Sequence, residues 1–86
     1  MTDSVLEFPC DFPIKMMGRD GREFREAAFE VIERHAGPAS AEAVRESSSR
    51  EGRFVSITVT IRATSQQQLD DIYRDLSSHE QILVAL

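Results

Sequence analysis

Few side chains in this sequence could carry chemistry, and its two histidines are the first to weigh. His35 and His79 each fall in the last turn of an expected helix, on or near its apolar side. Imidazoles there could bind a metal ion or shuttle a proton, but no second ligand follows at a suitable spacing. We therefore expect both rings to hydrogen-bond the free carbonyl groups of the helix ends, where positive charge is also favoured.

The cysteine and the carboxylates give no stronger signal. Cys10 is the only cysteine, so no internal disulfide can form, and a reducing compartment is expected. Asp70, Asp71 and Asp75 follow the polar side of the second expected helix, where water would solvate them. The sequence has no Ser-His-Asp arrangement, zinc-ligand spacing or phosphate-binding glycine loop. It predicts a protein that is not an enzyme, with no catalytic residue, metal or cofactor.

One segment supports a sharper hypothesis. Gly18, Arg19, Asp20, Gly21 and Arg22 join the first expected strand to the first expected helix. Glycines let a ligand approach the backbone, and free amide groups at a helix N-terminus attract anions. These five residues are therefore candidate ligand-binding residues. The alternative is a glycine-containing turn that Asp20 closes as a helix N-cap.

The spacing of apolar residues predicts the elements around this segment. Every second residue is apolar across residues 54–63, which is typical of a half-buried strand. From Leu69 the spacing changes to three and four residues, which indicates a helix ending near Ser78. The candidate caps are Thr64 or Ser65, with Gln67 or Gln68 closing a capping box.

The first half of the chain repeats this transition from strand to helix. Residues 12–17 form the expected strand and residues 21–36 the expected helix. Asp20 is its candidate N-cap, Glu23 completes a capping box, and Gly37 ends the helix.

Two weaker strands complete the pattern. Residues 42–48 are polar, as expected of an edge strand, residues 50–52 form a hairpin turn, and residues 82–86 alternate as a short last strand. The order β-α-β-β-α-β predicts an α+β, ferredoxin-like sandwich, a four-stranded antiparallel sheet with two helices on one face. Residues 1–11 are expected to be an N-terminal arm and residues 12–86 a single domain.

Composition and charge exclude several functions. The 86 residues carry 15 acidic against 10 basic side chains, a net charge of −5, which disfavours nucleic acid as a partner. RNA-binding members of this fold stack bases on sheet aromatics, whereas Ser56 and Thr58 occupy those places here. The first residues have no basic flank and no long apolar run, so we expect no signal peptide, and no apolar run reaches the length needed to cross a membrane. We expect a cytoplasmic protein.

Several short motifs in order along the chain resemble the YbeD-like (UPF0250) family of small, uncharacterised bacterial proteins. They are Leu6-Glu7-Phe8-Pro9, Lys15-Met16-Met17-Gly18, Arg34-His35-Ala36, Val55-Ser56-Ile57-Thr58-Val59, Ala63-Thr64 and Leu83-Val84-Ala85-Leu86. The resemblance implies a bacterial cytoplasmic protein with an ACT-like fold, similar to amino-acid-sensing regulatory domains. Its link to lipoate metabolism is contextual, and it supplies no catalytic residue. The chain differs in its polar second strand.

The sequence favours a non-enzymatic regulatory or interaction module that acts through a protein partner. The alternative is an ACT-like sensor that binds an amino-acid-type metabolite at residues 18–22, a segment that resembles the ACT ligand loop. An enzyme using His35 or Cys10 is the weakest hypothesis. The open sheet face and two sheet edges allow a monomer or a weak homodimer.

Overall fold

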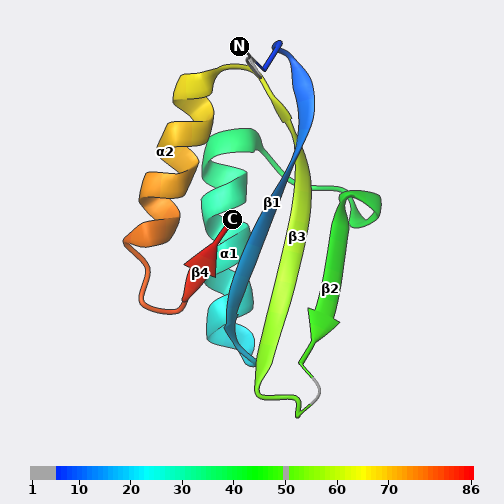
Figure 1. Ribbon diagram of the computed structural model, residues 1–86, viewed down its shortest axis with the longest axis vertical. Coiled ribbons are helices and arrows are strands. Elements are labelled where there is room, and N and C mark those ends of the chain that lie inside the picture. Colours follow the sequence, from blue (N-terminus) through cyan, green and yellow to red (C-terminus); the bar gives the residue numbers. More distant parts are fainter. Residues whose placement is uncertain (1–5, 50) are drawn as a thin grey trace, which may run out of the picture.

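A four-stranded antiparallel sheet covered on one face by two helices forms the protein (Figure 1). The structure is a computed structural model that describes residues 6–49 and 51–86. Its elements are β1 (Cys10–Arg19), α1 (Arg22–Ala36), the 3-10 helix η1 (Ala41–Ala43), β2 (Val44–Ser48), β3 (Phe54–Ala63), α2 (Gln66–Ser77) and β4 (Val84–Ala85). The strand order is β2-β3-β1-β4. The predicted ferredoxin-like fold is confirmed.

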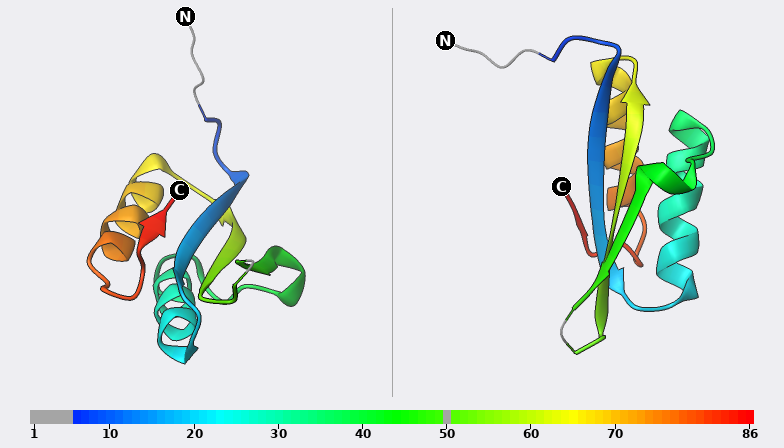
Figure 2. Two further views of the ribbon diagram at one scale, coloured as in Figure 1. Left: turned by 60° about the horizontal axis from the view of Figure 1, so that its bottom comes forward. Right: turned by 90° about the vertical axis from the view of Figure 1, so that its right-hand side faces the viewer.

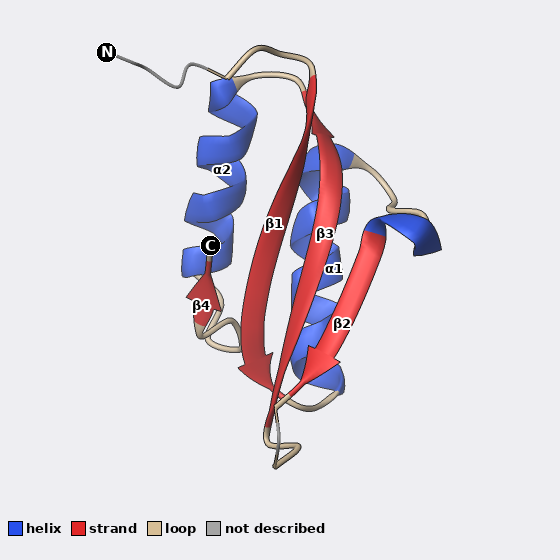
Figure 3. Ribbon diagram, turned by 45° about the vertical axis from the view of Figure 1, so that its right-hand side comes forward, coloured by secondary structure: helices blue, strands red, loops and turns tan. Residues whose placement is uncertain are grey.

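The core lies between the sheet and the helices, which share one side of it (Figures 2 and 3). Strand β3 supplies every second residue from Val55 to Ala63, as its alternation predicted. The buried side chains of the sheet are Ile14, Met16, Val55, Ile57, Val59, Ile61 and Ala63, and those of the helices are Phe24, Ala27, Ala28, Val31, Ile32, Leu69, Ile72 and Leu76. Because both helices present apolar stripes to one face, the other face stays open to water.

Strand β1 is longer than the predicted strand of residues 12–17. It begins at Cys10 and ends at Arg19, and it pairs with β3 along its whole length, from Cys10 opposite Ala63 to Arg19 opposite Phe54. Gly18 and Arg19 are therefore strand residues, not part of a turn. Pro13 is tolerated because its backbone faces the outer edge of β1, beyond the reach of β4, where no N–H is needed.

The helix ends confirm two of the predicted caps and contradict one. Ser65 caps α2, because its side chain accepts a hydrogen bond from the Gln68 amide, 3.1 Å away. Gly37 ends α1 with a φ of 81°, and its amide donates to the Glu33 carbonyl. The N-cap of α1 is Gly21, without a side-chain cap, so the predicted Asp20–Glu23 capping box is wrong. The Asp20 carboxylate instead accepts a hydrogen bond from Arg25 at 2.8 Å.

The two edge strands are short. Strand β2 pairs with β3 over five residues after η1, which occupies the start of the predicted strand of residues 42–48. Strand β4 spans two residues rather than the five of the predicted strand at residues 82–86. Backbone hydrogen bonds of Leu83 with Met17 and of Leu86 with Lys15 extend its pairing with β1. Arg50 of the predicted hairpin turn lies outside the described residues, whereas Gly52 has a φ of 72°, typical of a turn.

Candidate functional site

The junction between β1 and α1 does not hold all five predicted ligand residues in one place. Gly18 is buried in β1, where a Cβ atom would lie 2.4 Å from Phe24 Cδ1 and 2.5 Å from the Gln81 carbonyl oxygen. Its missing side chain makes room for helix packing and not for a ligand. Arg22, the first residue of α1, is exposed.

The other three predicted residues meet at a surface cavity of about 490 Å³. Arg19, Asp20 and Gly21 line it together with Glu23, Phe24, Glu80, Gln81 and Leu83. The lining residues thus include one arginine, three acidic residues and the aromatic residue Phe24. Such a mixture suits a ligand that carries both an ammonium and a carboxylate group.

Arg25 fastens this junction to the edge of the sheet. Its guanidinium donates to Asp20 at 2.8 Å, to the Gly21 carbonyl at 3.2 Å and, through Nε, to Glu46 of β2 at 3.0 Å. Hydrogen bonds with Glu46 and then Asp20 raise the pKa of the guanidinium, which keeps its charge. Glu46 lies on the helix-facing side of β2, opposite Ile57.

A second polar cluster, the Asp75 clasp, joins the two helices and was not predicted. Asp75 Oδ2 lies 2.9 Å from His35 Nε2 and 2.5 Å from Arg34 Nη1, and Asp75 Oδ1 lies 3.6 Å from His79 Nε2. Only 17% of the Asp75 side chain is exposed, so the prediction of a solvated carboxylate is wrong for this residue. Both histidines contact the carboxylate instead of the helix-end carbonyls. The i,i+4 spacing of Asp75 and His79 is the signal that could have revealed it.

Two opposing effects set the charge of Asp75. Partial burial raises the pKa of its carboxyl group, while the hydrogen bonds with His35 and Arg34 lower it by more. The pKa therefore lies below its ordinary value of 3.8. The Asp75 carboxylate is therefore ionised at neutral pH, and its contacts hold α1 against α2.

The surroundings of Cys10 and Tyr73 point to roles in packing. Cys10 is a half-buried free thiol in β1 beside the core. Burial raises the pKa of the Tyr73 phenol, which donates a hydrogen bond of 2.8 Å to the Leu86 carbonyl. Within residues 6–49 and 51–86, no three His, Cys, Asp or Glu side chains come together as a metal site. In that part of the chain no helix is long and apolar enough to cross a membrane.

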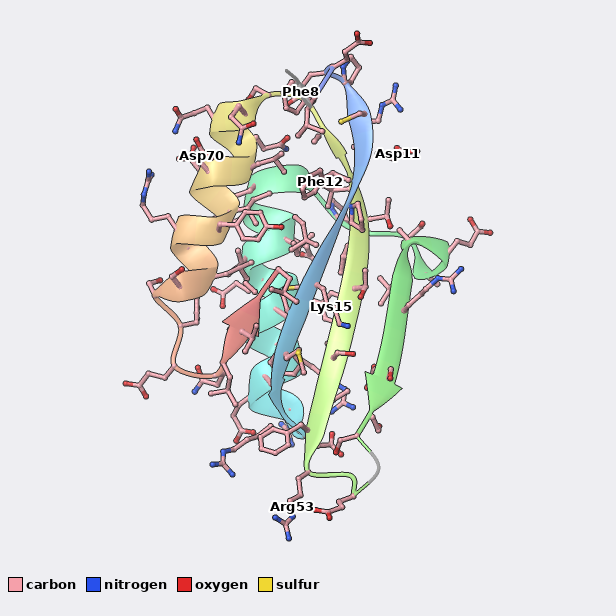
Figure 4. The ribbon with its side chains drawn as sticks, in the orientation of Figure 1. Phe8, Asp11, Phe12, Lys15, Arg53 and Asp70 are labelled. Carbon is pink, nitrogen blue, oxygen red and sulfur yellow. The ribbon has the colours of Figure 1, made fainter. Side chains whose placement is uncertain are left out.

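The face of the sheet opposite the helices is called the open face, because no helix of the described residues covers it. Ser56, Thr58 and Thr60 lie along its centre, as predicted. Met17 and Val84, paired across β1 and β4, lie at one margin. Figure 4, which looks onto this face, shows the Lys15 side chain over the sheet between β1 and β3. The face is polar at its centre and apolar along β4.

Fold and surfaces together define the class of the protein, a small ferredoxin-like α+β sandwich with an open sheet face. Within that class the chain belongs to the family described as "Protein of unknown function (DUF493)", whose match covers residues 3–86.

The relatives are bacterial UPF0250 proteins. The one from Paraburkholderia phytofirmans is 44% identical over 86 residues, which is 100% of this chain and 97% of the relative. One from Neisseria gonorrhoeae is 41% identical over 96% of this chain and 91% of its own length. The predicted family is thereby confirmed.

A solved structure shares the fold. The solution structure of protein HP0495 from H. pylori superimposes with a TM-score of 0.68 over 98% of this chain and 88% of its own, at 13% sequence identity. At that identity the likeness establishes the architecture alone.

Proposed function

We propose that the protein is a non-enzymatic interaction module that acts through a protein partner docked on the open face of the sheet. The observation that carries this proposal is the apolar margin of that face, formed by Met17, Val84 and Leu86. Val84 is 41% exposed and Leu86 is 65% exposed, although both extend the sheet beside β1. Covering such side chains contributes about 25 cal/mol for each Å² removed from water.

The proposal includes a cytoplasmic location and a monomeric or weakly dimeric state. The lone cysteine, Cys10, supports the location, because a single thiol needs no oxidising compartment. The short edge strands support the oligomeric state, because each offers a neighbouring strand few hydrogen bonds.

Affinity purification with matched variants tests this proposal. Tagged wild-type chain, a Val84→Ser/Leu86→Ser variant and a Leu83→Ser variant would be expressed in the native host, and their captured proteins compared by mass spectrometry. Leu83 is the control, because it is 52% exposed but lines the cavity instead of the open face. We expect a protein captured by wild type and Leu83→Ser and lost with the double variant. Equal capture by all three chains would contradict the proposal.

The cavity beside the β1–α1 junction supports a second candidate function, an ACT-like sensor of an amino-acid-type metabolite. Its mixed lining of Arg19, Asp20 and Glu80 favours this candidate. Thermal shifts with amino acids and lipoate-related compounds test it, with a Gly21→Val variant as the comparison. A Cβ atom at Gly21 would lie 3.3 Å from Glu23 Oε1, so the substitution narrows the cavity, and the backbone φ of 159° also makes a side chain there strained. A shift that persists in a folded Gly21→Val variant would remove this candidate.

A further inference from the structure

The open face carries a charge opposite to that of the whole chain. Because side chains alternate along β1, β2 and β3, the open face carries four cations and one carboxylate, that of Asp11. The whole chain has a net charge of −5. The four cations are Lys15, Arg19, Arg45 and Arg62. The acidic excess therefore lies elsewhere, on the helices and loops.

Each side of the sheet has both paired and unpaired cations. On the helix side, Arg25, Arg34 and Arg74 form ion pairs with carboxylates, whereas Arg22 forms none within the described residues. On the open face, Arg62 lies 3.5 Å from Asp11, and the Arg19 guanidinium lies over the Phe54 ring, 5.8 Å from its centroid. In the part of the chain that the structure describes, no carboxylate forms an ion pair with Lys15 or Arg45.

These two free cations belong to one row across the sheet. Thr58 of β3 pairs with Lys15 on one side and with Arg45 on the other. On β4, Leu86 exchanges backbone hydrogen bonds with Lys15 and so extends the row. Because neighbouring strands lie about 4.8 Å apart, the backbones of Lys15 and Arg45 are about 10 Å apart, with Leu86 one strand beyond Lys15.

From this row we infer that the partner presents the acidic face of an amphipathic helix, lying across the strands of the open face. Two carboxylates at positions i and i+7 lie about 10.5 Å apart on one helix face, which matches the spacing of the two cations. Along an extended strand, same-face residues lie about 6.7 or 13 Å apart and fit less well. An apolar residue one turn before the first carboxylate would meet Leu86. This inference rests on the proposed docking at the open face.

Two other occupants fit the row less well. A nucleic acid would meet the cations, but Ser56, Thr58 and Thr60 offer its bases no aromatic ring at the centre of the face. A second copy of the chain could offer Glu26 and Glu33, which are two turns apart on α1, but Glu23 and Arg22 occupy the positions where the apolar residue is needed.

Titration of the full chain with synthetic helical peptides, followed by NMR chemical shifts, tests the inference. The first probe carries two Glu at i and i+7 and a Leu one turn before them. The second probe has Lys in place of both Glu, and the third is a single-stranded oligouridylate. We expect the acidic peptide alone to shift the signals of open-face residues such as Ser56 and Thr58, and added salt to weaken its binding.

Charge-matched variants locate the contact. We expect Lys15→Glu/Arg45→Glu to weaken binding of the acidic peptide about tenfold or more, since reversed charges repel it. Arg22→Glu/Arg74→Glu changes the net charge equally on the exposed helices and should weaken binding less than about threefold.

The remaining outcomes count against the inference. The inference would be overturned if both double variants weakened binding equally. It would also be overturned if the oligouridylate or the Lys peptide bound more tightly than the acidic peptide, or if the chain formed concentration-dependent dimers that Lys15→Glu/Arg45→Glu abolishes. If no peptide binds but Val84→Ser/Leu86→Ser still loses a captured protein, the inferred chemistry of the partner is wrong and the docking face stands. If Val84→Ser/Leu86→Ser also captures the same proteins as wild type, the proposed function itself is wrong.

Discussion

At the scale of single residues, Asp75 joins parts of the chain that are distant in sequence. Its carboxylate contacts Arg34 and His35 at the end of α1 and His79 beyond the end of α2. Charged hydrogen bonds are worth about 1.5–3 kcal/mol each, but the Arg34 side chain is half exposed and solvent weakens its share.

Replacing Asp75 with Asn should therefore lower the free energy of unfolding at pH 7 by about 1–2 kcal/mol. Urea unfolding followed by circular dichroism measures the change. Asp70→Asn is the matched control. Asp70 is exposed on the outside of α2, and among the described residues it accepts a side-chain hydrogen bond from Gln66 alone, so the change in unfolding free energy should stay within about 0.5 kcal/mol. Equal effects of the two substitutions would contradict the clasp.

The contribution of Asp75 to the free energy of unfolding should depend on pH. A pKa lowered in the folded state means that Asp75 stabilises the protein above its ordinary value of 3.8 and that this contribution is lost as the pH falls through the lowered value. Between neutral pH and about pH 3, wild type should lose more stability than Asp75→Asn. Parallel curves of unfolding free energy against pH would show that the clasp does not titrate.

Gly18 is the other residue whose environment fixes its identity. A methyl group there would overlap the Phe24 ring and the Gln81 carbonyl. Gly18→Ala should lower the free energy of unfolding by about 1–3 kcal/mol, because overpacking forces its neighbours to move. Ser56→Ala, on the open face of the same sheet, serves as the control in chemical denaturation. An unchanged stability of Gly18→Ala would mean that α1 does not pack so closely on β1.

At the scale of elements, the two helices begin in different ways. Helix α2 has a side-chain cap, Ser65, supported by Gln68, whose side-chain oxygen accepts from the Thr64 amide at 2.8 Å. Helix α1 has none, and Arg25 instead binds the preceding Asp20 and Gly21. The N-terminus of α1 thus depends on a side chain of its own first turn.

Ser65→Ala should cost about 1 kcal/mol of unfolding free energy, which is typical for the loss of a capping oxygen. Asp20→Ala removes only an ion pair between half-exposed side chains and should cost no more than about 0.2–1 kcal/mol. Thermal unfolding of both variants measures the difference. A larger loss for Asp20→Ala would restore the capping role that its sequence position suggested.

At the scale of the whole molecule, the sheet has one dry face and one wet face. Neighbouring residues of β3 sample both, because Ile57 is fully buried and Thr58 lies on the open face. Ile57→Ala should cost about 2–5 kcal/mol, whereas Thr58→Ala should cost less than about 1 kcal/mol. Urea unfolding compares the two, and similar losses would place a second layer over the open face.

The sequence predicted most of this architecture because its signals are local. The alternation around Ile57 predicted the bounds of β3. The candidate caps Thr64 and Ser65 predicted the start of α2 to within one residue, and the structure selects Ser65. The prediction that Gly18 belongs to a turn is wrong, because a glycine in the sequence can indicate either a turn or a close packing contact. The Asp75 clasp and the cation row of the open face depend on how separate elements align, which no single segment encodes.

The outer edges of β2 and of the start of β1 discourage growth of the sheet into a larger aggregate. A strand added beside β2 would cover Glu46, a charge already engaged by Arg25, and one added beside the start of β1 would find no donor at Pro13. The protein should therefore stay soluble at high concentration, and it should bind other proteins through the open face instead of by strand addition at these edges.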